Sequence, residues 1–139
     1  MKIFVHTKQL GKKPRKVAPC PYALPCIPGT LRELIGLLVR GSVETYNLRL
    51  GQKDPSAVLS PENIEDMSQV GKIAFGIPFG GKEVRVEEAL ETAFQGFGDG
   101  LYRLFLNETE LTQLDEHLEL KENDLITIIR LVMLTGSFF

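Results

Sequence analysis

The length, composition and charge of this chain favour one folded domain and exclude several classes of protein. Its 139 residues are 43% hydrophobic and 24% charged, which predicts a single core and argues against disorder. With 16 basic and 18 acidic residues the formal net charge is -2, so we expect neither a nucleic acid nor a membrane surface as partner. The chain opens on a strand pattern instead of a secretory signal, and its 2 cysteines are too few for a disulfide scaffold. We therefore expect a cytoplasmic protein.

The first predicted element is a strand over residues 2–8. Ile3 and Val5 alternate with polar or aromatic neighbours and should share the buried face. Three prolines follow between residues 19 and 25, and proline cannot donate to a central hydrogen-bond ladder. We therefore predict only a short edge strand over residues 15–18, followed by an extended loop.

The first predicted helix has a clear start. Thr30 can cap it while Glu33, three residues later, reaches back toward the cap. Apolar residues then recur at helical spacing, at Leu31, Leu34, Ile35 and Leu38. Gly41 is predicted to end this helix or to be a weak point in it, with residues 43–50 continuing as a second helical segment.

The middle of the chain predicts two further helices. The first would start at Ser60–Pro61 and end at Gly71. Residues 72–75 are expected to be extended and to lead into a hairpin loop over residues 76–81. The second helix is predicted over residues 86–97, and its apolar stripe comprises Val86, Ala89, Leu90, Ala93, Phe94 and Phe97.

The last part of the chain predicts a second β region. A strand over residues 101–106 is followed by a turn at residues 107–109. A long apolar strand is predicted over residues 125–133, and such a sequence is typical of a strand that is covered on both faces.

Both ends of the chain resemble ubiquitin. Five identities fall in the first seven positions, at Met1, Ile3, Phe4, Val5 and Thr7. Residues 103–111 and 122–131 resemble its third strand with the following turn and its last strand, and the helix at Thr30 stands in the expected order. The resemblance implies an α+β, ubiquitin-like β-grasp with a mixed sheet whose first and last strands are central and parallel. It implies a single domain over residues 1–139, with residues 41–100 as an insertion.

The resemblance leaves two alternatives for the C-terminal residues. Ubiquitin and its sulfur-carrier relatives end in two glycines, because an activating enzyme adenylates the terminal carboxylate in a narrow channel. Here a single glycine, Gly136, is followed by three more residues. In one alternative a protease removes Ser137–Phe139, and Gly136 becomes the reactive end of a modifier or sulfur carrier. In the other, which we favour, residues 132–134 extend the strand, and Phe138 and Phe139 pack on the domain or on a partner.

A glycine-rich loop offers a weaker alternative. Residues 76–82 satisfy the G-x4-G-K spacing of a phosphate-binding loop. However, Glu83 stands where a hydroxyl would hold magnesium, and it would repel phosphate. The residues after it are expected to be extended, whereas a phosphate loop opens directly into a helix. A small ligand-binding site at Gly76–Gly81 stays the third alternative.

Other chemistry-bearing residues predict no catalytic or metal site. Cys20 and Cys26 are too widely spaced for a C-x2-C zinc knuckle, and the only histidines are His6 and His117. We expect ordinary thiols, with a transient disulfide as the residual alternative. The carboxylates fall in runs typical of solvated helix faces, so we expect no cofactor and no enzymatic activity.

The leading hypothesis is a non-catalytic interaction or adaptor module with a protein partner. By residue match, Phe105 and Ile128 occupy two positions of the apolar surface on which ubiquitin's partners dock. The alternative is that inserted helices cover that face and make both residues part of the core. The insertion over residues 41–100 would supply specificity, since insertions on a rigid scaffold often carry function. The oligomeric state stays open.

Overall fold

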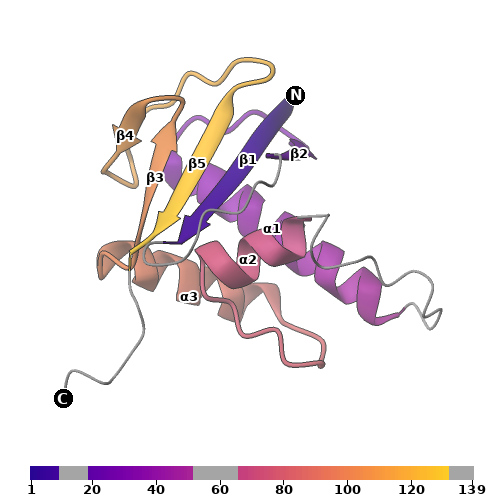
Figure 1. The fold of residues 1–139 in the computed structure, drawn as a ribbon. Coiled ribbons are helices and arrows are strands. Elements are labelled where there is room, and N and C mark those ends of the chain that lie inside the picture. Colours follow the sequence, from indigo (N-terminus) through magenta and orange to yellow (C-terminus); the bar gives the residue numbers. More distant parts are fainter. Residues whose placement is uncertain (10–18, 52–65, 132–139) are drawn as a thin grey trace.

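A five-stranded mixed sheet with helices packed against one face makes up the protein (Figure 1). The computed structural model describes residues 1–9, 19–51 and 66–131. In chain order the elements of these residues are β1 (Lys2–Gln9), β2 (Cys20–Ala23), α1 (Leu31–Leu50), α2 (Met67–Ala74), α3 (Val86–Gly98), β3 (Tyr102–Leu106), β4 (Thr109–Leu111) and β5 (Leu125–Arg130). None of these helices is long and apolar enough to cross a membrane.

The strands lie in the order β2-β1-β5-β3-β4. β1 and β5 are parallel, and the remaining neighbours are antiparallel. The prediction that the first and last strands pair in parallel inside one sheet is therefore confirmed. β5 ends at Arg130, whereas the predicted strand continued through residues that lie outside the described part of the chain.

One face of the sheet is buried against the helices. Ile3 and Val5 of β1 are fully buried, as their alternation predicts. Their neighbours on this face are Leu104, Ile126 and Ile128, which are also fully buried. Because strand side chains alternate between faces, the residues between them point to the opposite side of the sheet.

β2 corrects the sequence-based prediction of an extended loop. It pairs with β1 at the edge of the sheet, and Pro21 lies opposite Phe4. The Phe4 N–H donates to the Asp124 carbonyl, toward β5, over 2.9 Å. Phe4 and Pro21 are therefore a non-hydrogen-bonded pair of the antiparallel ladder. The absence of an N–H in Pro21 thus removes no hydrogen bond between β1 and β2. The predicted edge strand over residues 15–18 lies outside the described residues.

The start of α1 agrees with its prediction. The Thr30 hydroxyl accepts from the Glu33 N–H at 3.2 Å, and the Glu33 carboxylate accepts from the Gly29 N–H at 2.6 Å. The carboxylate thus reaches one residue further back than a capping box requires. The four predicted apolar positions, Leu31, Leu34, Ile35 and Leu38, are all fully buried.

Two glycines that were predicted to end helices lie inside them. α1 continues through Gly41 to Leu50, and α2 continues through Gly71 to Ala74. A Cβ at Gly41 would lie 2.6 Å from Cζ of Tyr22, and one at Gly71 would lie 2.7 Å from Cβ of Ser42. Each glycine therefore allows another element to approach the helix closely.

α2 and the loop after it differ from the prediction in other ways. Asp66 caps α2, accepting from the N–H groups of Ser68 and Gln69 at 3.0 and 3.2 Å. The predicted start at Ser60–Pro61 lies outside the described residues. Residues 72–74 are helical instead of extended. The loop over residues 76–81 joins α2 to α3, so it is not a hairpin loop.

α3 matches its predicted range and shares one apolar core with the sheet. Ala89 and Ala93 are buried, and the larger apolar side chains of the helix are partly buried against the same core. The ring of Tyr102 on β3 lies edge-on to Phe75 and Phe97, with ring centroids 5.2 and 6.0 Å apart. The core is therefore continuous between the sheet and the helices of residues 41–100.

Candidate interaction surface

The second face of the sheet carries no described helix, and we call it the open face. In Figure 1 the sheet is seen from this side, with α1 behind it. Cross-strand pairing fixes which residues share the face, since paired residues point to the same side. The open face comprises Lys2, Phe4, His6, Lys8, Pro21, Ala23, Arg103, Phe105, Glu110, Leu125, Thr127 and Ile129.

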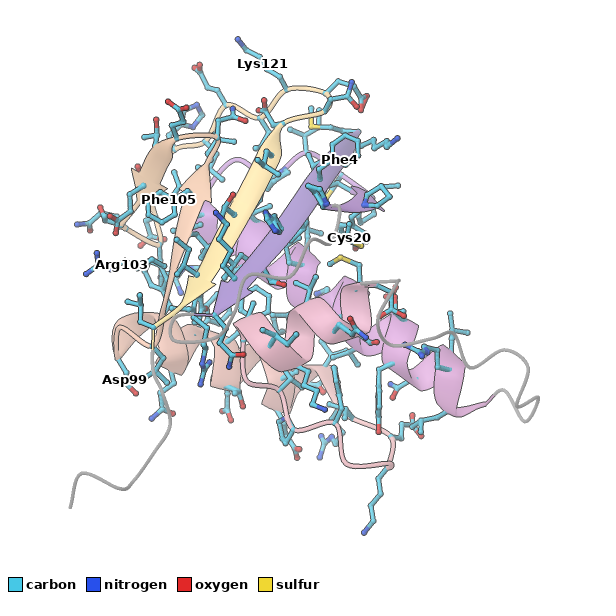
Figure 2. The ribbon with its side chains drawn as sticks, viewed as in Figure 1. Phe4, Cys20, Asp99, Arg103, Phe105 and Lys121 are labelled. Atoms are coloured by element: carbon cyan, nitrogen blue, oxygen red, sulfur yellow. The ribbon has the colours of Figure 1, made fainter. Side chains whose placement is uncertain are left out.

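The centre of the open face is a platform of apolar and aromatic side chains. Thr127 is only 9% exposed. Its direct neighbours are His6 on β1 and Phe105 on β3. Phe4 and Ile129 are, like Phe105, half-buried on this face. Large side chains therefore pack around the threonine and leave their outer surfaces to solvent. Phe4 and Phe105 come from strands on either side of β5 (Figure 2).

Cationic side chains border this platform. The Lys2 ammonium lies 5.0 Å from the centroid of the Phe4 ring, within the range of a cation–π contact. Lys8 and Arg103 are exposed at the other end of the face. Arg103 lies 3.8 Å from the Glu110 carboxylate, a pair too exposed to contribute more than about 1 kcal/mol. The border is thus mostly positive and solvated.

The two residues singled out from the sequence do not lie together. Ile128 pairs with Leu104 on the helix side and is fully buried, whereas Phe105 pairs with Thr127 on the open face. A shift of one residue along a strand moves a side chain to the opposite face. Ile129, one residue later, is the β5 residue that shares the face of Phe105. Ile128 is therefore core and is not accessible to a partner.

Other members of the open face were not singled out from the sequence. Phe4 and His6 alternate with Ile3 and Val5, so the sequence does place them opposite the core. No local signal distinguishes Ile129 from Ile128, because both belong to the same apolar run.

The glycine-rich loop does not have the geometry of a phosphate loop. Residues 83–85 are not helical, and α3 begins only at Val86. The ring of Phe79 stacks on Tyr46 of α1 at 4.1 Å, and the Tyr46 hydroxyl accepts from the Gly81 N–H at 2.7 Å. The side chain of Asn47 both accepts from and donates to the backbone of Val84, each at 3.2 Å. The loop is therefore held against α1.

A hollow of about 280 Å³ lies between this loop and α3. Ile77 and Ala89 are its buried members, and Lys82, Glu83 and Glu88 stand at its exposed border. Two carboxylates beside one ammonium make the hollow unfavourable for a phosphate group.

Comparisons with known proteins leave the surface to be interpreted from its own geometry. No protein-family model, no curated protein and no solved structure matches the chain. The arguments for a function therefore rest on the sheet, its open face and the chemistry of the residues on it.

The described residues include two thiols and a buried phenol among their titratable groups. Cys20 is buried in β2 and Cys26 is exposed, and they are not joined by a disulfide. Burial raises the pKa of Tyr22, and the charges of Glu44 and Cys26 add to that effect. In the part of the chain that the structure describes, no group of three or more His, Cys, Asp or Glu side chains could hold a metal ion. The alternative reactive residue, Gly136, lies outside the described residues.

Proposed function

We propose that this protein is a ubiquitin-like β-grasp domain that acts as a non-catalytic interaction module for a protein partner. β1 and β5 are parallel neighbours inside a mixed sheet, as the resemblance of the two chain ends implies. The long helix α1 follows β2 in the order expected for that fold. These features support the β-grasp assignment.

The open face is the observation that carries the proposal. Phe4, Phe105 and Ile129 are half-exposed on it, with no described helix above them. Contiguous apolar surface with a polar border is typical of protein–protein interfaces. Aromatic side chains and arginine are also the residues that most often dominate binding energy, and Phe105 and Arg103 lie on the same strand face.

Residues 41–100 would serve both the fold and the specificity of the module. Val70 and Ala74 of α2 and Ala93 of α3 are fully buried in the common core, so these helices stabilise the sheet. Pro78, Gly80 and their neighbours in the loop before α3 are exposed. This loop would give the module a surface of its own, separate from the open face.

Site-specific photo-crosslinking tests the proposal. A photoreactive phenylalanine analogue at position 105, expressed in the source cells, should cross-link a defined partner. The variant Phe105→Asp should reduce capture of the same partner at least about tenfold, equivalent to about 1.4 kcal/mol of binding free energy. Leu48→Asp is the matched control, because Leu48 is a 72% exposed apolar residue on α1, on the opposite side of the sheet.

The comparison of the two variants decides the outcome. Capture that falls for Phe105→Asp and persists for Leu48→Asp supports docking on the open face. Capture that persists for Phe105→Asp would contradict it, provided that thermal denaturation shows both variants to be folded.

A further inference from the structure

One row of the open face places an apolar side chain between two cations. Ile129 on β5 pairs with Lys8 on β1 and with Arg103 on β3, so the three side chains stand next to one another. Phe105, two residues after Arg103, extends the apolar surface on the same face. The Glu110 carboxylate, 3.8 Å from Arg103, offsets only one of the two positive charges. An occupant of this row must therefore present an apolar side chain together with negative charge.

A loop of the same chain presents such a side chain. Ile27 lies between β2 and α1 and is 68% exposed, although it is large and apolar. The loop is anchored on both sides of it, because Leu24 and Pro28 are buried and the Leu24 N–H donates to the Met1 carbonyl at 2.8 Å. An apolar side chain on an anchored loop loses little conformational entropy when it enters a contact.

Negative charge lies next to this loop. Residues 112–124, which join β4 to β5 and which we call the acidic connection, contain five carboxylates and one lysine. The Leu118 N–H donates to the Gly29 carbonyl at 2.9 Å, and this bond ties the acidic connection to the loop. Glu119, the next residue, is largely exposed. Ile27 is therefore presented by a loop with an acidic border, which complements the charge beside Ile129.

The other exposed large apolar side chains fit the open face less well. In the described residues these are Leu48 and Leu50, at the end of α1. Arg49, which separates them, forms an ion pair with Asp66 at 2.7 Å. This end of α1 therefore lacks the excess of negative charge that the cations beside Ile129 favour.

The loop and the open face belong to different sides of the molecule. The loop leads into α1, which lies behind the sheet when the open face is in front (Figure 1). In Figure 2, Lys121 marks the acidic connection above the strands, whereas Arg103 lies further down the sheet. One molecule therefore cannot place Ile27 on its own open face, but it can contact one neighbour through the loop and another through the face.

We propose that copies of this protein associate head to tail, with Ile27 of one copy packed on Ile129 and Phe105 of the next. The acidic connection of the first copy then faces Lys8 and Arg103 of the second. The inference rests on the proposed function, because it names a second copy of the chain as the occupant of the open face. Two different surfaces form the contact, so it does not close within a pair and adds copies in series.

Sedimentation of the full chain tests the association. Its average mass should rise with protein concentration at about 20 mM salt and should fall toward the monomer mass at about 300 mM, because salt screens the exposed charges. The variant Ile27→Ser should weaken the association at least about tenfold, since it removes a buried apolar side chain from the contact. Leu48→Ser is the matched control, and it should associate like the parent.

A mixture of two blocked variants distinguishes a head-to-tail contact from a symmetric one. The double variant Lys8→Glu, Arg103→Glu has a blocked open face and an intact loop, whereas Ile27→Ser has an intact face and a blocked loop. Each variant alone should sediment as a monomer. The equimolar mixture should form a dimer and no larger species, because only one productive contact is left for each pair.

Three results would overturn the association, provided that thermal denaturation shows the variants to be folded. The first is a parent chain that sediments as a monomer at every concentration and salt. The second is equal weakening by Ile27→Ser and Leu48→Ser, which would remove the specific role of the loop. The third is a mixture of the blocked variants that sediments like the two variants separately, which would exclude a head-to-tail contact.

Photo-crosslinking at position 105 separates this inference from the proposed function. A cross-linked product with the mass of two chains would support a second copy as the occupant. Capture of a different protein by a chain that sediments as a monomer would overturn the inference and leave the interaction module intact. A chain that associates but gives no product at position 105 would overturn both, because the copies would then meet away from the open face.

Discussion

Tyr102 connects β3 to two helices through one buried side chain. Its ring contacts Phe75 after α2 and Phe97 in α3, and its hydroxyl donates to the Ala93 carbonyl at 2.5 Å. Burial raises the pKa of Tyr102 well above its ordinary value, and the opposing effect of the Arg130 charge is smaller. The folded protein therefore keeps this phenol neutral under conditions in which the unfolded chain would ionise it.

The variant Tyr102→Phe should lower the free energy of unfolding by about 1 kcal/mol at neutral pH, since it removes one buried hydrogen bond. The raised pKa also gives a pH dependence. The contribution of this group is constant below about pH 10 and is lost progressively as the pH rises above that value. Urea denaturation at pH 8 and pH 11 should show a smaller decline for the variant than for the parent. Equal declines would contradict the assignment, because the two proteins differ in no other titratable group.

The open face was partly predictable at the level of single residues. The alternation of residues 2–8 distinguishes Phe4 and His6 from Ile3 and Val5. In residues 125–129 four of the five side chains are aliphatic, so alternation gives no contrast between the two faces. Which of Ile128 and Ile129 points inward is decided by cross-strand pairing with Leu104 and Arg103, and that information is not local.

Among the helices, α1 and α2 meet at an unusually close contact. Gly71 faces Ser42, and a Cβ there would also lie 3.2 Å from Cδ1 of Ile77. The Ser42 hydroxyl donates to the Leu38 carbonyl at 2.8 Å, so this buried polar group is satisfied within its own helix. The missing side chain of Gly71 allows the two helices to approach each other.

The substitution Gly71→Ala should destabilise the protein by about 1–3 kcal/mol, because the Ser42 Cβ is fixed to the backbone of α1 and the helices must separate. Gly36→Ala is the control. It lies in α1 with nothing within 4 Å of the added methyl, and it should stabilise the helix by up to about 1 kcal/mol. Chemical denaturation of both variants measures the difference. A stabilised Gly71→Ala protein would contradict the close contact.

The elements themselves were easier to predict than their ends. Apolar residues at helical spacing predict α1 and α3, because the period is visible in the sequence. The predicted helix ends at Gly41 and Gly71 were wrong. The sequence does not distinguish a glycine that ends a helix from a glycine that allows another element to pack closely against it. β2 was missed because the effect of Pro21 depends on which way its backbone faces in the sheet.

At the scale of the whole molecule, the described residues share one core, although the resemblance to ubiquitin implies an inserted segment. Fully buried residues of α2 and α3 and those of β3 and β5 belong to the same apolar cluster. The helices of residues 41–100 therefore cover the sheet instead of forming a separate unit. We therefore expect the sheet and these helices to unfold together.

The described residues should unfold in one cooperative transition. Far-ultraviolet circular dichroism and tyrosine fluorescence should give coincident urea curves. Native-state hydrogen exchange is the sharper measurement, and protected amides of α2 and β5 should exchange with similar free energies. Exchange of α2 through an opening that leaves β5 protected would contradict a shared core and indicate an independent insertion.

Pro21 affects whether the edge of this sheet can pair with a strand of another chain. On the outer side of β2, alternation would present the N–H groups of residues 21 and 23, and Pro21 has none. β4, at the opposite edge, is only three residues long. A foreign strand approaching either border would find few donors with which to continue the ladder. The protein can thus expose an apolar sheet face, while the edges of its sheet disfavour the edge-to-edge strand pairing that joins copies into fibrils.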